Sequence, residues 1–142
     1  GKRGLTLKKR EGDLKTPLGN FKFNLLLYRK DRIKKINTKI KKKAIKRNFG
    51  WCDDPNSSNY NKLVKFPFSQ SAERLYLKEN IYDLILVINF NTKPIIKRRG
   101  SAIFLHIANK KFSATKGCIA IKKKSLMKIL PFITRKTRIF IS

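Results

Sequence analysis

Residues 101–108 alternate between two kinds of side chain, and this alternation favours an extended strand over a helix. Successive side chains of a strand point to opposite faces of a sheet, so the segment has one mixed face and one aliphatic face. The mixed face consists of Ala102, Phe104, His106 and Ala108, and the aliphatic face of Ile103, Leu105 and Ile107. His106 is the only histidine of the chain. We therefore expect a sheet element that holds this imidazole in a fixed direction.

Three further segments have strand character, and one short segment has helical character. Residues 21–28 combine alternation with an apolar run, residues 84–88 are entirely apolar, and residues 137–141 are rich in β-branched and aromatic side chains. Ser125–Leu130 fit a short helix with the serine as N-cap, ended by Pro131. The sequence therefore predicts a mostly β fold with one or two short helices.

Chain length, the length of the apolar runs and the positions of turn-forming residues limit the architecture further. A chain of 142 residues suits one domain with a real core, and we expect a single domain over 1–142. The apolar runs are strand-sized and fall short of the ~20 residues that a membrane helix needs, so no membrane span is expected. Residues 15–19 and 53–59 contain Pro with Gly, Asp, Asn or Ser, and predict turns. Because the chain begins at Gly1 rather than Met, we expect a segment upstream to have been removed.

Cys118 follows His106 by twelve residues and stands directly after Gly117. The polar segment 109–114 predicts a loop, and Gly117 permits a sharp turn before the next apolar residues. This path can bring the thiol beside the imidazole, and an adjacent imidazolium lowers a cysteine pKa below its free value of about 8.5. One interpretation is therefore a cysteine nucleophile with its base. The other is a satisfied core histidine and a small buried hydrophobe.

Several motifs spread along the chain carry a resemblance to a known family. Residues 10–21 have the sequence REGDLKTPLGNF, residues 50–55 the sequence GWCDDP, and residues 101–106 and 115–120 the sequences SAIFLH and TKGCIA. Together with the strand at 82–88, these motifs resemble the L,D-transpeptidase family of the YkuD type. The resemblance covers most of the chain, and it is a hypothesis that geometry can test.

The resemblance implies a YkuD-like β-sandwich and an enzyme that needs no cofactor. Cys118 corresponds to the family's nucleophile and His106 to its base, while Thr115 and Gly117 shape the turn and, through backbone N–H groups, the oxyanion site. The implied partners are peptidoglycan stem peptides, and the implied location is the cell envelope or periplasm. With water in place of the acceptor amine, the same apparatus would be an L,D-carboxypeptidase.

Two positions depart from the family's usual pattern. Better-known members have His before Gly-Cys and Arg or Asn shortly after the Cys, where this chain has Lys116 and Ala120. The substrate-binding residues are therefore unassigned. These departures also suit a competing hypothesis, a non-catalytic basic module that keeps the fold and binds polyanions.

The charge balance is extreme, with 36 basic and 8 acidic side chains and a formal net charge of +28. Lysines are dense between Lys34 and Arg47. Such a field attracts anionic polymers non-specifically. The run lacks interleaved aromatic residues, and the chain has no zinc-finger or RNA-recognition signature, so we expect no specific nucleic-acid partner. The open alternatives are a solvated surface and attraction to anionic cell-wall polymers or membrane surfaces.

Three other polar features are candidate sites. A disulfide between Cys52 and Cys118 would remove the proposed nucleophile, so we expect Cys52 to be a free, partly buried thiol. Asp53 and Asp54 favour a turn over a metal site, because one histidine and separated cysteines give no zinc spacing. Arg99 suits either a substrate carboxylate or solvent.

Overall fold

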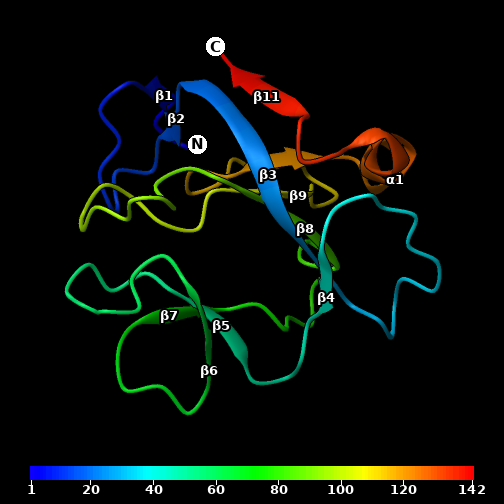
Figure 1. The fold of residues 1–142 in the computed structure, drawn as a ribbon, viewed down its shortest axis with the longest axis horizontal. Coiled ribbons are helices and arrows are strands. Elements are labelled where there is room, and N and C mark those ends of the chain that lie inside the picture. The colour runs from blue at the N-terminus through cyan, green and yellow to red at the C-terminus, as the bar shows by residue number, and fades with distance from the viewer.

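The computed structural model describes residues 1–142 and consists of three β-sheets, one α-helix and a short 3-10 helix (Figure 1). The strands are β1 (Leu5–Thr6), β2 (Thr16–Pro17), β3 (Gly19–Tyr28), β4 (Lys42–Ala44), β5 (Phe49–Cys52), β6 (Leu63–Lys65), β7 (Ala72–Arg74), β8 (Leu84–Ile88), β9 (Phe104–Ile107), β10 (Ile119–Ile121) and β11 (Arg138–Ile141). The helix α1 (Lys123–Ile129) leads directly into the 3-10 helix η1 (Leu130–Phe132). Neither helix combines the length and the apolar character that crossing a membrane requires.

The largest sheet has the strand order β10-β9-β8-β3-β11, with β4 paired to the end of β3. The pairs β9–β10 and β3–β4 are parallel, and the other pairs are antiparallel. The ten-residue β3 pairs with β11 along its first half and with β8 along its second. At the opposite edge, the parallel pair β9–β10 places Ala120 opposite His106, so this edge carries the site.

The two faces of the large sheet bury two different parts of the core. On one face, side chains such as Leu105 pack against Leu126 of α1. On the other face, side chains such as Phe104 pack against Trp51 of β5, with the two rings edge to face at 5.2 Å. Because the side chains of a strand alternate, one short strand supplies both clusters. The predicted division of residues 101–108 into an aliphatic and a mixed face is confirmed.

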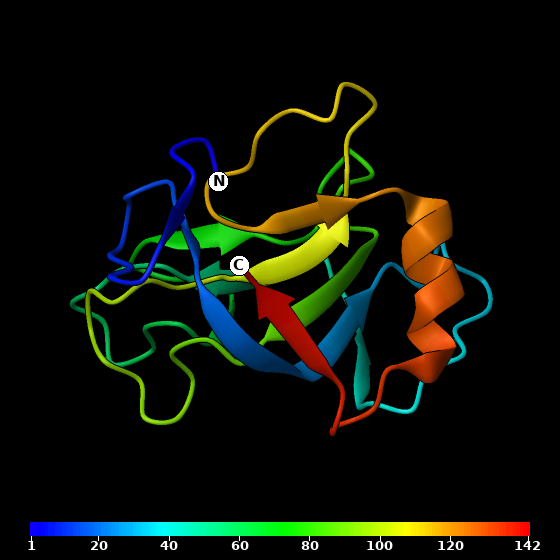
Figure 2. The same cartoon turned by 90° about the horizontal axis from the view of Figure 1, so that it is seen from above.

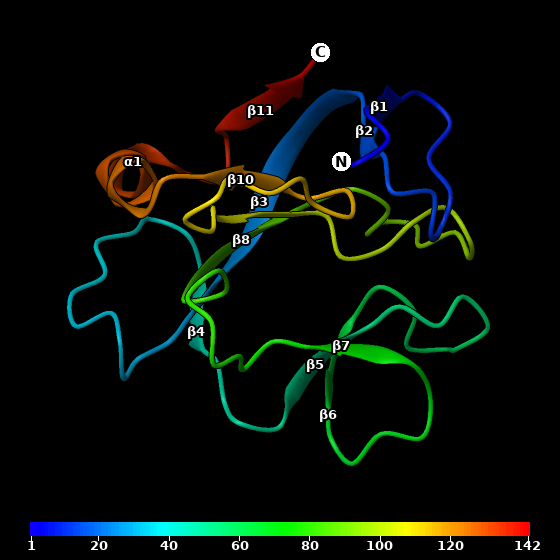
Figure 3. The same ribbon diagram turned by 180° about the vertical axis from the view of Figure 1, so that it is seen from behind.

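The second core cluster lies between the large sheet and the antiparallel sheet β6-β5-β7 (Figure 3). Figure 1 shows β5, β6 and β7 below the large sheet, and α1 at one side of it. The arrangement is a sandwich of two sheets, with the helix packed on the outer face of the larger one. The predicted fold, mostly β with one or two short helices, is confirmed.

Most of the expected strands occur where the pattern placed them. Residues 21–28 lie in β3, residues 84–88 form β8, and β11 begins one residue after the predicted start at Thr137. The turn predicted for residues 53–59 is present, since the carboxylate of Asp54 accepts a hydrogen bond of 2.9 Å from the backbone N–H of Asn56.

Two predicted boundaries were wrong. The helix begins at Lys123 rather than after Ser125, and Lys122 at its start makes no side-chain cap. The buried Leu126 sets the helix position through its packing, and its N–H bonds to the Lys122 carbonyl at 3.0 Å. The predicted strand at 101–108 is reduced to β9, since Ala102 has a φ of 51°, which interrupts an extended ladder.

The turn predicted for residues 15–19 was also wrong. Thr16 and Pro17 are buried and extended, and they pair in parallel with β1, where the N–H of Leu18 donates to the Thr6 carbonyl at 2.8 Å. Pro17 and Gly19 suggested a turn, but Pro is also tolerated in an edge strand, where its missing N–H is not needed as a donor. This N-terminal pairing brings the first residues of the chain to the candidate site.

Candidate active site

His106 is held on β9 with its ring orientation fixed. The residue is 6% exposed, and its Nδ1 lies 2.9 Å from the carbonyl oxygen of Ile107. A carbonyl oxygen only accepts hydrogen bonds, so we assign the ring proton to Nδ1, which leaves Nε2 as an acceptor. The ring of Tyr82 packs edge to face against the imidazole at 5.2 Å. Burial lowers the pKa of His106 below its ordinary value, so the imidazole is neutral at pH 7.

Cys118 lies at the end of a tight turn that Thr115 closes. The Thr115 hydroxyl donates to the Cys118 carbonyl at 2.5 Å, and it accepts a longer hydrogen bond of 3.3 Å from the Gly117 N–H. Gly117 has a φ of 142°, a conformation that side-chain-bearing residues rarely adopt. The backbone N–H of Cys118 donates to no group of the chain, so it is free for a ligand.

The N-terminal segment lies so close to Gly117 that it is a second reason for glycine at this position. A Cβ atom at this position would lie 2.9 Å from the carbonyl oxygen of Lys15. The N–H of Lys2 in turn donates to the Thr115 carbonyl at 2.8 Å. The first residues of the chain therefore brace the outer side of the turn, and a side chain at position 117 would push them away.

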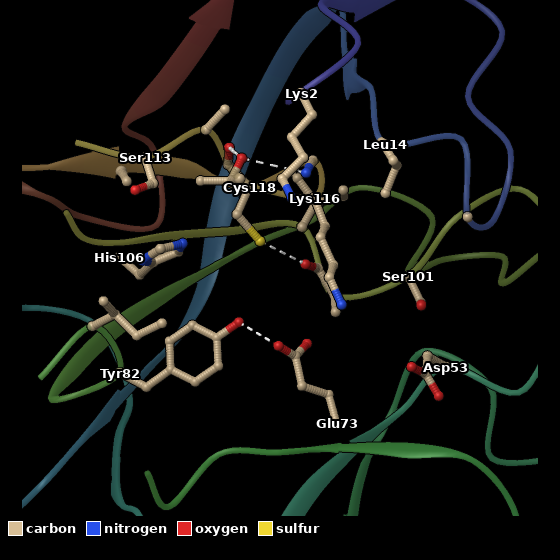
Figure 4. Close-up of a pocket in the computed structure, with 18 of the residues that line it drawn as sticks. Lys2, Leu14, Asp53, Glu73, Tyr82, Ser101, His106, Ser113, Lys116 and Cys118 are labelled. Atoms are coloured by element: carbon tan, nitrogen blue, oxygen red, sulfur yellow. Dashed lines mark hydrogen bonds between the residues drawn. The ribbon is translucent and has the colours of Figure 1, made fainter. Parts of the chain in front are cut away.

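The parallel pair β9–β10 brings the predicted site residues to one cavity of about 660 Å³ (Figure 4). Its lining includes His106, Thr115, Gly117 and Cys118. In the close-up, the imidazole edge is directed toward the side of the cavity that holds the thiol. The structure thus brings together all four residues that the sequence singled out.

The thiol of Cys118 is protonated at rest. Its Sγ donates to the Ala102 carbonyl at 3.0 Å. Burial raises its pKa to about 12, a shift that the charge of Glu73 reinforces and that the N–H of Phe104 and the ammonium of Lys9 oppose. The sequence suggested a thiolate and imidazolium pair with a lowered thiol pKa. The structure instead holds a neutral thiol near a neutral imidazole, because both groups are largely removed from water.

Tyr82 and Glu73 lie across the cavity from the thiol. The Tyr82 hydroxyl donates to Oε1 of Glu73 at 2.6 Å (Figure 4). Burial raises the pKa of Glu73, which the hydrogen bond from Tyr82 and the charge of Lys116 oppose. Neither residue was predicted as a site residue, because Glu73 comes from the smaller sheet and neither residue stands in the motif around Cys118. The apolar strand that begins two residues after Tyr82 was the only local signal.

The cavity concentrates the chain's few acidic groups. Of the 8 acidic side chains, three line this cavity, namely Glu11, Asp53 and Glu73. The lysines of its lining are Lys2, Lys9 and Lys116. Lys9 is paired with Asp13, at 2.5 Å. In a protein with a net charge of +28, this cavity is therefore close to charge balance, which suits a ligand bearing both an amine and a carboxylate.

Two polar residues hold the entry to β9 in place. Asn61 accepts hydrogen bonds at Oδ1 from the Trp51 indole N–H (2.9 Å) and from the N–H of Ala102 (3.0 Å). Glu11 accepts at Oε2 from the Tyr60 hydroxyl (2.6 Å) and from the Ser101 hydroxyl (2.7 Å). These contacts tie the turn after β5 and the N-terminal segment to the residues that face Cys118.

The family model for the L,D-transpeptidase catalytic domain, YkuD, matches residues 1–141. The chain belongs to the YkuD family. No curated protein and no solved structure matches the chain significantly. Membership makes this an L,D-transpeptidase-type domain of a family that is linked to peptidoglycan peptides and generally associated with the cell envelope.

The two departures from the usual YkuD motif both lie at the cavity. Lys116 is exposed and extends across it (Figure 4), and Ala120 lines it opposite His106 in the strand register. Arg99 is exposed and does not line the cavity, so the solvated alternative describes it. The basic run from Lys34 to Arg47 contributes no residue to the lining either.

Cys52 is a free thiol, as expected, but it is fully rather than partly buried. It lies at the end of β5 with its N–H bonded to the Lys62 carbonyl at 2.9 Å. Its neighbour Asp53 takes part in the cavity wall and accepts a hydrogen bond of 2.6 Å from the Ser71 hydroxyl.

Proposed function

We propose that the chain is a cysteine L,D-transpeptidase that acts on peptidoglycan stem peptides within a single catalytic domain. The observation that supports this most directly is the common cavity of His106 and Cys118, on neighbouring parallel strands of a YkuD family member. The thiol is the nucleophile and the imidazole is the base. Thr115 and Gly117 set the turn that supplies backbone N–H groups to the oxyanion.

The first half-reaction forms a thioester. Nε2 of His106 takes the proton of the Cys118 thiol while Sγ attacks the carbonyl carbon before the terminal D-amino acid. The free N–H of Cys118 stabilises the negative charge that develops on the carbonyl oxygen. The carbon–nitrogen bond then breaks, His106 returns the proton to the leaving amine, and the D-amino acid departs.

The second half-reaction transfers the acyl group. An amine of a second stem attacks the thioester, His106 accepts a proton from it, and the thiolate of Cys118 leaves and is reprotonated. Since the resting thiol bonds to the Ala102 carbonyl, the sulfur must leave that contact to attack. The charge balance of the cavity supports a substrate that carries both charges.

The direct test is intact-mass measurement after incubation with a carbapenem or with a tetrapeptide stem. A carbapenem opens and adds its whole mass, whereas a tetrapeptide adds its mass less the terminal amino acid. We expect an adduct on the unaltered protein and none on Cys118→Ala. A folded protein that gains no mass with either probe would contradict the proposal and favour the non-catalytic basic module.

The same assay separates transfer from hydrolysis. With the tetrapeptide and an added D-amino acid as acceptor amine, transfer yields an exchanged tetrapeptide, whereas an L,D-carboxypeptidase yields the tripeptide. We expect the exchanged product to dominate. Tripeptide alone at saturating acceptor would assign the chain to the carboxypeptidase alternative.

We expect the ring of Tyr82, and not its hydroxyl, to position His106. Tyr82→Phe keeps the edge-to-face contact with the imidazole, so the acylation rate should stay within about threefold. It leaves the carboxylate of Glu73 without its donor, which costs about 1–3 kcal/mol of unfolding free energy. Tyr82→Leu removes the ring and should slow acylation about tenfold or more.

Urea unfolding and the acylation rate of both variants check this division. Combining Tyr82→Phe with Glu73→Gln should cost less than the sum of the two single changes, because the lost hydrogen bond is counted once. Equal acylation rates for Tyr82→Phe and Tyr82→Leu would show that the ring does not position the imidazole.

A further inference from the structure

A cluster of large apolar side chains stands exposed at the far side of the large sheet from the smaller one. Phe132 of η1 is 77% exposed and Phe140 of β11 is 75% exposed, and Ile129 at the end of α1 lies beside them at 40%. Exposed phenylalanines are costly in water, and clustered ones mark an interaction surface. Figure 2 shows β11 (red) and α1 (orange) joined by a short connection, and η1, which carries Phe132, lies in that connection.

These side chains line a groove of about 400 Å³. Its floor is formed by core residues that reach the surface here, including Leu105, Ile133 and Ile139. No residue of this groove lines the cavity that holds Cys118. The groove is therefore a separate feature, and changes to it leave the candidate active site intact.

No acidic residue lines the groove, and Arg138 is the charged residue of its lining. Residues 84–142 contain no Asp or Glu, and β3, which also contributes to the groove, contains none either. Four exposed cations stand near the phenylalanines in the chain, namely Lys128, Arg135, Lys136 and Arg138, and Arg138 also lines the groove. An occupant must therefore combine negative charge with an apolar part that fills the groove.

We propose that this groove, with the exposed cations of residues 128–138, docks the protein on an anionic lipid membrane. Phe132 and Phe140 enter the boundary between headgroups and acyl chains, and the four cations contact the anionic headgroups. A second copy of the chain does not fit, because it would bring an identical set of cations against this one. A nucleic acid fits less well, since the groove is lined mainly by apolar side chains and only Thr137 and Arg138 offer polar side-chain atoms to bases.

The test measures sedimentation of the protein with vesicles of phosphatidylglycerol and phosphatidylcholine. We expect binding to mixed vesicles and little binding to pure phosphatidylcholine, because the attraction of the cations to anionic headgroups brings the protein to the membrane. The double variant Phe132→Ala/Phe140→Ala should bind the mixed vesicles at least tenfold more weakly. Phe112→Ala, which removes another exposed phenylalanine outside the groove, should bind like the unaltered protein.

A matched pair of charge variants separates the effect of the cations near the groove in the chain from the effect of the overall positive charge. Arg135→Gln/Lys136→Gln should weaken binding more than Lys34→Gln/Lys35→Gln, which removes the same charge from exposed positions in the loop between β3 and β4. Equal losses would overturn the proposal, because they would show that only net charge matters.

A tryptophan placed at the surface reports insertion without relying on truncation. The chain's only tryptophan, Trp51, is buried, so Phe132→Trp should show a blue shift of emission on mixed vesicles that Phe112→Trp does not show. Three results would overturn the proposal: vesicle binding unchanged in the double phenylalanine variant, a dimer without lipid that this variant dissociates, or binding of single-stranded DNA that loses as much affinity as vesicle binding.

Discussion

His106→Gln is expected to slow acylation of Cys118 about a thousandfold at pH 7, while the fold is retained. A general base contributes about 10²–10⁴ to such a reaction. A value well above the lower end of that range is expected here because burial raises the pKa of Cys118 to about 12, so the thiol does not ionise by itself near neutrality. Gln keeps the polar character and approximate size of the side chain but cannot accept the thiol proton as a base.

The pH dependence distinguishes a lost base from a distorted site. In the unaltered protein the neutral imidazole is the active form, and burial lowers its pKa, so the acylation rate should be level above about pH 6.5 and fall only at lower pH. In His106→Gln, the rate should follow the thiolate fraction and rise about tenfold for each pH unit up to the thiol pKa.

Acylation by a carbapenem, followed by mass spectrometry between pH 5 and pH 9, measures both profiles. Cys118→Ala provides the background. A level profile for His106→Gln, or a rate within tenfold of the unaltered protein, would show that another group removes the proton. Tyr82 is not that group, since its pKa is raised further above its usual range by burial.

Local patterns predicted the elements that carry the site. The alternation over residues 101–108 identified both faces of β9, because a strand with one face in each core cluster must alternate. The motif around His106 and Cys118, through its resemblance to the YkuD family, identified residues of the cavity, and the parallel pairing of β9 and β10 brings them together. Both features depend on residues that are close in the chain.

Long-range contacts explain what the sequence could not predict. Glu73 of the smaller sheet accepts a hydrogen bond from Tyr82. Lys15 lies against Gly117, although the two residues come from opposite ends of the chain. Burial and the charge of Glu73, which is distant in the chain, raise the pKa of the Cys118 thiol. The predicted lowering of this pKa rested on the neighbouring imidazole alone. The start of α1 was misplaced for a similar reason, since the packing of Leu126 and not a capping side chain determines it.

Because Lys15 lies against Gly117, we expect Gly117→Ala to lower both the stability of the protein and its acylation rate. Gly117→Ala places a Cβ 2.9 Å from the Lys15 carbonyl oxygen and imposes a side chain on a backbone with a φ of 142°. Backbone strain of this kind costs about 1–3 kcal/mol, and the contact with backbone atoms adds to it. The turn must shift to relieve both, and it carries the Cys118 N–H with it, so acylation should slow at least a hundredfold.

Gly4→Ala is the matched control, because Gly4 has a φ of 81° but open space around its missing side chain. Gly4→Ala introduces only backbone strain and leaves the cavity lining unchanged. It should therefore lose about 1 kcal/mol of unfolding free energy and keep its acylation rate. Urea unfolding and carbapenem acylation of both variants give the comparison. If Gly117→Ala acylates as fast as Gly4→Ala, the geometry of the turn does not govern the oxyanion site, and the N–H of Cys118 is not its donor. If only Gly117→Ala is slow, the geometry of the turn that the N-terminal segment braces governs acylation.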